Sequence, residues 1–254
     1  MAEGGLARLE RAPTYRLVYD AIEREILSGR LRIGDPLPTE MELADQFGVN
    51  RSTVREGIRL LEQGGLVTRD GGKRPKISAP HYQDLASSAS RALVLHAVTF
   101  RELWEASMLI EPLIAELAAR HVGEADLARL AQNLEATEAA IADLEAGGAD
   151  VERFVSLDRE FHEILAEATG NRVLMLAHEP VTTLFIPAGR IILPRLKTWR
   201  RVLDAHRRIV GYLAAGDANG ARDWMRKHMD DFRRGYALTE LDFETPLDAA
   251  AYSR

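Results

Sequence analysis

The chain has 254 residues, of which 46% are hydrophobic and 28% are charged, as is typical of a soluble globular protein with one large or two ordinary domains. It contains no cysteine, which excludes disulfide bonds and thiolate metal sites and agrees with a reducing, cytoplasmic location. No stretch approaches the ~18 apolar residues of a membrane span, and the N-terminus lacks a signal-peptide core, so no membrane partner is expected.

The net charge of −6 is unevenly distributed. Residues 1–80 carry 13 basic and 12 acidic side chains, whereas the remainder carries 20 and 27. Within residues 51–76 the balance is 7 basic to 3 acidic. A basic patch on an acidic chain indicates a local DNA-binding face.

The pattern at the start of the chain predicts helices. Apolar residues at 18, 21, 22 and 26 follow a helical period that ends near Gly29. Thr39 and Glu42 have capping-box spacing, and the helix that they open is expected to bury Leu43, Ala44 and Phe47. Gly48 is expected to end this second helix. Asn50 can cap a third, which gives a helix-turn-helix.

The third helix combines two different faces. Its basic face carries Arg51, Arg55 and Arg59 at four-residue spacing, with Ser52 and Thr53 near its start, while Val54, Ile58 and Leu61 form an apolar face. Guanidinium groups suit phosphate oxygens and the O6/N7 edge of guanine, so the element resembles a helix that lies in a DNA major groove. The alternative is a solvated helix whose arginines only favour solubility.

A short hairpin is predicted after Gly64-Gly65. Residues 66–69 and 73–78 have strand-like patterns, and the glycines at 71 and 72 lie between them. The tip is basic, with Lys73, Arg74 and Lys76, which suits a wing against a phosphate backbone. Pro75 should restrict the second strand to a sheet edge.

These segments resemble the winged-helix domain of GntR-type bacterial transcription regulators. The similarity covers residues 15–78 and rests on Gly34-Asp-Pro-Leu-Pro-Thr-Glu, Leu43-Ala, Gly48-Val-Asn-Arg-Ser-Thr-Val-Arg-Glu and Gly64-Gly-Leu-Val. It implies base or phosphate contacts from Arg51 and Arg55, supported by Asn50, Ser52, Thr53 and the wing glycine Gly72. Many members have an arginine where this chain has Met41, so operator preference is expected to differ.

The rest of the chain is expected to be helical. Residues 79–98 are interpreted as a linker that can become partly helical, and helices are predicted at about 100–121, 124–146, 151–169, 172–187, 195–215 and 217–236. Pro187 is expected to end or kink the fourth of these. The predicted fold is therefore mainly α: a winged helix-turn-helix domain with a small β-hairpin over 1–78, the linker, an antiparallel helical bundle over 99–236, and a loosely packed tail over 237–254.

Four side chains in the helical part form a possible metal site. Asp158 and His162 are four residues apart on one helix, and His206 and His228 lie on the last two long helices. One carboxylate and three imidazoles could hold Zn²⁺ or a similar ion. For each histidine the alternative is a solvated or hydrogen-bonded residue.

The same region resembles the FCD ligand-binding domain of the FadR subfamily. The similarity rests on Asp158-Arg-Glu-Phe-His162 with Gly170-Asn171, and on Ala205-His206, Gly216-Asp217 and Met225-Arg-Lys-His228. It implies that Asp158, His162, His206 and His228 bind a divalent ion (zinc, with nickel or manganese as alternatives), and that a small organic acid binds near this ion. The remaining histidines, at 81, 96, 121 and 178, do not match the pattern.

The pocket departs from the family in one respect. Many members carry an arginine two residues after a glutamate in the first FCD helix, where it can hold a carboxylate, but here Glu105 is followed by Ala106 and Ser107. Three interpretations follow: the effector is not a simple carboxylate, another cation such as Arg190 holds it, or the pocket has a different shape. Ser107, Glu111 and Arg190 are the candidate effector contacts. Trp104, Met108 and Glu111 share one helix and could equally be ordinary core residues.

Together these resemblances predict a homodimeric transcription regulator, a repressor, that binds a palindromic double-stranded DNA operator and responds to a small-molecule effector. No enzymatic activity is expected. One alternative is a metal-dependent hydrolase, although His162-Glu163-Ile-Leu-Ala lacks the His-Glu-x-x-His zincin pattern. The other alternative is a metal sensor with no organic effector.

Overall fold

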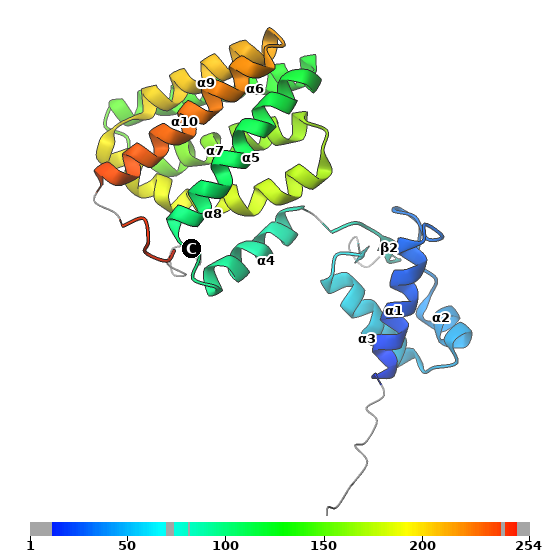
Figure 1. Cartoon of the computed structure of the whole chain (residues 1–254). Coiled ribbons are helices and arrows are strands. Elements are labelled where there is room, and N and C mark those ends of the chain that lie inside the picture. The colour runs from blue at the N-terminus through cyan, green and yellow to red at the C-terminus, as the bar shows by residue number, and fades with distance from the viewer. Residues whose placement is uncertain (1–11, 70–73, 81, 240–241, 248–254) are drawn as a thin grey trace, which may run out of the picture. The chain divides into compact units, whose positions relative to one another are not determined.

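The computed structural model describes residues 12–69, 74–80, 82–239 and 242–247 (Figure 1). The chain forms two units, Met1–His81 and Tyr82–Arg254, each of which is described by itself. No helix among the described residues is both long and apolar enough to cross a membrane.

The N-terminal unit contains three helices, α1 (Thr14–Leu27), α2 (Glu40–Phe47) and α3 (Arg51–Gln63). The predicted signals are all present: Thr39 and Glu42 form a capping box, Gly48 ends α2 in the left-handed region (φ +66°), and Asn50 caps α3. The apolar faces of the three helices meet in one core, which contains Val18, Ile22, Leu43, Val54, Ile58 and Leu61. Phe47 is the exception to the prediction, because this last residue of a short helix is 37% exposed.

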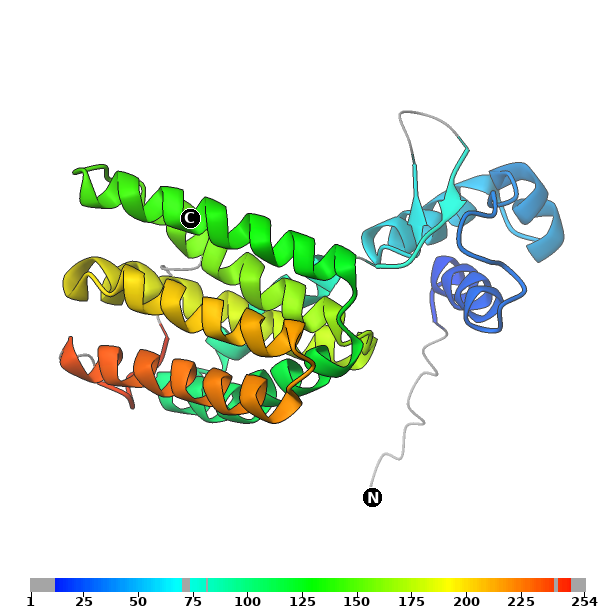
Figure 2. The ribbon, with the colours of Figure 1, turned by 90° about the horizontal axis from the view of Figure 1, so that it is seen from above.

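A hairpin follows α3, as predicted. Strand β1 (Val67–Thr68) pairs antiparallel with β2 (Lys76–Ile77), with Val67 opposite Ile77 (Figure 2). The edge position expected for β2 is wrong, because Lys76 also forms a bridge with Pro36 on the other side. Pro75 has no N–H to donate, but its carbonyl accepts from the Leu37 N–H at 2.8 Å, and Leu37 O accepts from Arg74 Nε at 2.8 Å.

The described part of the C-terminal unit is mainly helical. It contains α4 (Tyr82–Leu95), α5 (Phe100–His121), α6 (Glu124–Glu145), α7 (Val151–Ala168), α8 (Arg172–Leu196), α9 (Trp199–Ala214) and α10 (Ala218–Leu238). Helix α10 packs along α5 and α9, while α7 packs against α6 and α8 (Figures 1 and 2). The main core lies between α5, α6, α7, α9 and α10 and includes Ile114, Leu130, Phe161, Ile209 and Met225.

Three segments of this unit differ from the sequence-based expectation. Residues 79–98 are not merely a linker, because α4 lies there and packs against α8. Helix α8 does not end at Pro187 but continues to Leu196, since its packing against α4, α5 and α7 outweighs the loss of single helix hydrogen bonds. The described tail, residues 242–247, is not loose: the N–H of Arg101 donates to Phe243 O, and the N–H of Leu247 to Val98 O.

Candidate functional site

Arg51 and Arg55 form an exposed cationic stripe on α3. Their side chains are 62% and 63% exposed, whereas Val54 and Ile58 on the opposite face are buried. Both arginines pair with Glu40 on α2: Arg55 Nη2 lies 2.8 Å from Glu40 Oε2, and Arg51 Nη2 lies 3.6 Å from the same oxygen. Hydrogen bonding by Arg55 lowers the pKa of Glu40, which therefore carries its negative charge beneath the stripe at neutral pH.

The other predicted residues of α3 have local partners. Asn50 Oδ1 accepts from the Thr53 N–H at 2.8 Å and from the Ser52 and Thr53 hydroxyls at 2.7 Å each, so this oxygen is used in capping. Arg59 forms an ion pair with Glu56 at 2.8 Å, one turn away on the same helix. The contacts of Asn50 fix the first turn of α3, and the pair with Glu56 restrains the Arg59 side chain.

The wing is described only in part. Gly72 and Lys73, both predicted to contact DNA, lie outside the described residues. Arg74 Nε donates to Leu37 O at 2.8 Å, and its Nη2 lies 3.5 Å from Glu42, so this arginine is held against the body of the unit while half of its side chain stays exposed.

Asp158, His162, His206 and His228 come together inside the C-terminal unit. One ligand atom of each lies within 4.8 Å of the others, and the three histidines are buried. His206 Nε2 is 3.3 Å from His228 Nε2 and 3.5 Å from Asp158 Oδ1. The His206 ring stacks on Phe161 with a centroid separation of 3.7 Å, which fixes its orientation.

Burial controls the protonation of this cluster. Desolvation, together with the neighbouring imidazoles, lowers the pKa of His228 to about 3 and that of His206 well below its ordinary value, so both rings are neutral at pH 7. Burial also lowers the pKa of His162, but the charge and hydrogen bond of Glu111 outweigh it and raise that pKa to about 9. For Asp158, burial raises the pKa.

A second buried group adjoins the cluster. Glu111 on α5 is bonded on one side to His162 Nδ1 at 2.9 Å and on the other to His178 Nε2 at 2.8 Å, and the Thr182 hydroxyl lies 2.9 Å from the same His178 nitrogen. Sequence reasoning missed His178, which belongs to no motif and lies on α8. The sequence offers one indication of His178: it lies four residues before Thr182 in an apolar helix, so the two side chains share a face. His96 and His121 are exposed.

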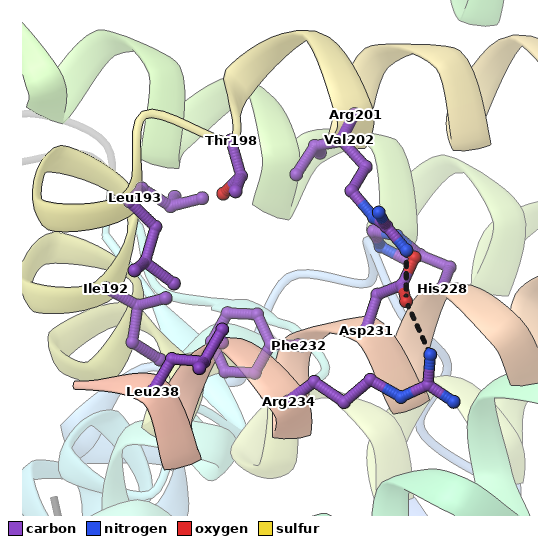
Figure 3. A pocket seen from close by; sticks show the side chains of 12 residues that line it. Ile192, Leu193, Thr198, Arg201, Val202, His228, Asp231, Phe232, Arg234 and Leu238 are labelled. Carbon is purple, nitrogen blue, oxygen red and sulfur yellow. Dashed lines mark hydrogen bonds and ion pairs between the residues drawn. The ribbon is translucent and has the colours of Figure 1, made fainter. Parts of the chain in front are cut away.

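Two cavities adjoin the cluster. The inner one has a volume of about 40 Å³ and is lined by Glu111, Asp158, Arg159, His162 and His228, among others. The outer one has a volume of about 260 Å³ and lies between α8, α9 and α10 (Figure 3). Leu193, His228 and Phe232 line both cavities, so the two share a wall.

The candidate effector contacts lie in different surroundings. Glu111 lines the inner cavity, whereas Ser107 and Arg190 line neither cavity. The Ser107 hydroxyl donates to Leu103 O within α5, and Arg190 pairs with Glu152 at 2.6 Å. The arginine that lines the inner cavity is instead Arg159, whose Nε is buried and has no hydrogen-bond partner among the described residues.

The comparisons with known proteins agree with both halves of this arrangement. The profile "Bacterial regulatory proteins, gntR family" matches residues 14–77, and "FCD domain" matches residues 102–231. The transcriptional regulator LutR of Bacillus subtilis is 30% identical over 83% of this chain and 97% of its own length. The transcriptional repressor NanR of Cronobacter sakazakii is 29% identical over 68% of this chain and 65% of its own length.

A solved structure gives the same result. Streptococcus agalactiae GntR superimposes with a TM-score of 0.61 and 28% identity, over 87% of this chain and 99% of that one. Both units therefore have relatives among proteins named as transcription regulators, and these relatives are not enzymes, which removes the hydrolase alternative. The chain belongs to the GntR family of bacterial DNA-binding transcription regulators and carries an FCD effector-binding domain in its C-terminal unit.

Proposed function

We propose that this protein is a homodimeric, cytoplasmic repressor of the FadR subfamily. In this proposal, a carboxylate effector binds beside a divalent metal ion in the C-terminal unit and changes the affinity of α3 for a palindromic operator. The observation that carries the proposal is the convergence of Asp158, His162, His206 and His228 beside a cavity, in the same chain as an exposed arginine stripe.

The donor set suits a metal ion. Nitrogen and oxygen ligands at about 2.0–2.1 Å from a tetrahedral ion lie about 3.3–3.4 Å apart, and the measured separations at His206 Nε2 are 3.3 Å and 3.5 Å. The neutral rings of His206 and His228 have lone pairs available without loss of a proton. Zinc matches three imidazoles and a carboxylate, with nickel or manganese as alternatives. When bound, such an ion supplies positive charge that attracts an acid.

Arg159 supports a carboxylate effector. Its unpartnered Nε is a buried donor at the inner cavity, and an unpaired buried donor costs free energy that an incoming acceptor would recover. Arg159 Nη2 pairs with Glu163 at 2.5 Å and with Glu179 at 2.6 Å, which holds the guanidinium in place and leaves its Nε as the donor for a ligand. Many family members have, at the position of Ser107, an arginine that can hold a carboxylate. We assign this role to Arg159 here, rather than to Arg190.

The DNA contacts are proposed for the exposed side of α3 and for the wing. Arg51 and Arg55 are assigned to base edges or phosphates, and Asn50, Ser52, Thr53, Arg59, Gly72, Lys73 and Arg74 to supporting positions. A second copy of the chain would present a second α3 to the other half of a palindrome. Leu109 and Leu113 support a dimer, because they lie four residues apart on an exposed side of α5, where Leu109 is 76% exposed.

One experiment tests both operator binding and its regulation by metal and acid. The protein first selects a duplex from a random-sequence library, and its affinity for that duplex is then measured by fluorescence anisotropy with zinc or a chelator, across a panel of small acids. An acid should change operator affinity only with zinc present. His206→Ala should abolish this response and retain DNA binding, whereas the exposed His121→Ala should behave like the parent.

Three results would contradict parts of the proposal. An acid response that persists in chelator or in His206→Ala would remove the metal from it. Equal losses on selected and random DNA in Arg51→Ala and Arg55→Ala would reassign these residues to phosphates; if they read bases, we expect each to cost about 1–3 kcal/mol of discrimination. If calorimetry of the zinc-loaded protein gives no heat with any acid, the protein is a metal sensor.

A further inference from the structure

The two adjoining cavities differ sharply in size and in chemistry. At the ~10–15 Å³ that one water-sized group needs, the inner cavity of 40 Å³ has room for about three such groups, which is the size of a carboxylate. The outer cavity, at 260 Å³, is more than six times larger. A ligand that uses both would therefore have a small head and a larger body.

The outer cavity is mainly apolar. Its walls include six hydrophobic side chains: Ile192, Leu193, Leu196, Val202, Phe232 and Leu238. Ile192 and Leu193 are buried, whereas Leu238 is exposed, so the cavity runs from the bundle interior toward solvent. Figure 3 shows Ile192, Leu193 and Leu238 on one side of the space, and His228, Arg201 and Asp231 on the other.

The arginines at the charged side of this cavity are already paired with aspartates. Arg201 holds Asp231 in a bidentate pair at 2.7 and 2.8 Å, and Arg234 lies 3.8 Å from Asp231 (Figure 3). Arg234 also pairs with Asp230 at 2.9 Å. A second carboxylate on a ligand would find no free cation there and would lie near Asp231. The wall chemistry therefore favours an uncharged, apolar body.

We propose that the outer cavity is a subsite for the apolar body of the effector, and that the effector is a monocarboxylic acid with a hydrocarbon chain of several carbons. The carboxylate occupies the inner cavity beside Arg159 and the metal ligands. The hydrocarbon chain extends into the outer cavity between Leu193, His228 and Phe232, which line both cavities. This inference rests on the proposed function for the head group, and it adds the class of acid.

Calorimetry on the zinc-loaded, full-length protein tests the subsite with acetate, butyrate, hexanoate and octanoate. Affinity should rise by about fourfold for each methylene beyond butyrate until the cavity is full, as expected for burial of ~0.8 kcal/mol per methylene. Adipate and suberate, the dicarboxylates of matched length, should bind at least tenfold more weakly than hexanoate and octanoate.

Two variants test whether the outer cavity causes the rise in affinity with chain length. Val202→Trp narrows the outer cavity and should remove the increase with chain length while leaving the affinity for acetate unchanged. Val173→Trp makes the same substitution at a position on α8 that is 76% exposed and lines neither cavity, and it should keep the full increase. Zinc content and acetate binding of both variants show that the inner site is intact.

The outcomes separate the two proposals. If acetate binds but hexanoate binds no tighter, or if adipate matches hexanoate in the parent protein, the subsite is wrong while the metal-bound carboxylate stands. A rise with chain length that persists in Val202→Trp also overturns the subsite. If zinc binds but no acid of any length does, the effector assignment and the subsite both fall.

Discussion

Glu40 controls how two arginines of α3 face the solvent. Its carboxylate is only 19% exposed, yet it lies 2.8 Å from Arg55 and 3.6 Å from Arg51, both of which are mostly exposed. A half-buried acid beneath two exposed cations restrains their side chains and reduces the positive charge that they present to phosphate. Orientation favours recognition of a particular base, whereas the charge reduction weakens binding to any DNA.

Removing this charge should therefore change affinity and selectivity in opposite directions. We expect Glu40→Gln to bind random DNA more tightly, and to lose up to about 1–3 kcal/mol of discrimination between selected and random duplexes. Fluorescence anisotropy at several salt concentrations measures both quantities. Glu25→Gln removes an equal charge from the Glu25–Arg30 pair on α1 and should leave discrimination unchanged. Parallel losses in both variants would mean that only net charge matters.

Local signals made the candidate site only partly predictable. The spacing of Asp158 and His162 placed both on one face of one helix, and the structure places His206 and His228 beside them from two other helices. The pairing of Glu111 with His178 could not be predicted in this way, because it joins residues 67 positions apart and depends on how α5 packs against α8. Arg159 was missed because its position at a cavity depends on the packing of several helices, which no sequence pattern reports.

Helix boundaries were predictable where side chains satisfy the helix's own backbone. The predicted capping box at Thr39 and the glycine at 48 mark the start and the end of α2 in the structure. Prediction failed where packing decides the outcome, as in α8, which continues through Pro180, Pro187 and Pro194. The tail was misjudged for the same reason, since Phe243 joins the cluster of Phe100 and Tyr236.

Gly57 shows how such packing affects stability. It lies in the interior of α3, where a Cβ atom would meet Val18 Cγ1 at 2.9 Å and Tyr15 O at 3.0 Å. Helix propensity alone favours alanine by about 1 kcal/mol. We nevertheless expect Gly57→Ala to lower the free energy of unfolding of the N-terminal unit by about 1–3 kcal/mol, because the added methyl group forces α1 away from α3.

The matched control for this substitution is in α9. A Cβ atom at Gly211 would have no neighbour within 4 Å, so Gly211→Ala should raise stability by about 0.5–1 kcal/mol through helix propensity. Thermal and urea unfolding measure both variants. Stabilisation by Gly57→Ala would show that α1 and α3 adjust without cost and would refute the close-packing explanation.

The two units of the chain differ in charge, in keeping with separate tasks. Residues 1–80 are close to neutral, with the basic excess concentrated in 51–76, while the rest of the chain carries the acidic excess. A basic excess of this kind attracts phosphate, whereas an acidic excess is repelled by it, so this distribution supports the proposed assignment of DNA binding to α3. In the C-terminal unit, three buried histidines with displaced pKa values link the stability of the protein to pH.

Without metal, the stability of the protein should be greatest near pH 6.5. The pKa of His162 is about 9 in the folded state and 6.5 in its ordinary state, so the stability that it contributes is complete below pH 6.5 and is lost as the pH rises through 9. His206 and His228 have lowered pKa values, so the unfolded chain takes up their protons first, and stability also falls as the pH drops below 6.5.

Urea unfolding at pH 5.5, 6.5, 7.5 and 9 in chelator tests this dependence. Between pH 6.5 and 9 the free energy of unfolding should fall by up to about 3 kcal/mol, the equivalent of the shift at His162. With saturating zinc, the free energy of unfolding should rise instead of fall between pH 6.5 and 9. A bound ion takes the place of the His162 proton and binds more tightly as that proton becomes easier to remove. Glu111→Gln removes the carboxylate that raises the pKa of His162, so it should flatten the alkaline limb and leave the acid limb in place. Stability that rises from pH 6.5 to 9 in chelator would show that His162 is neutral in the folded protein.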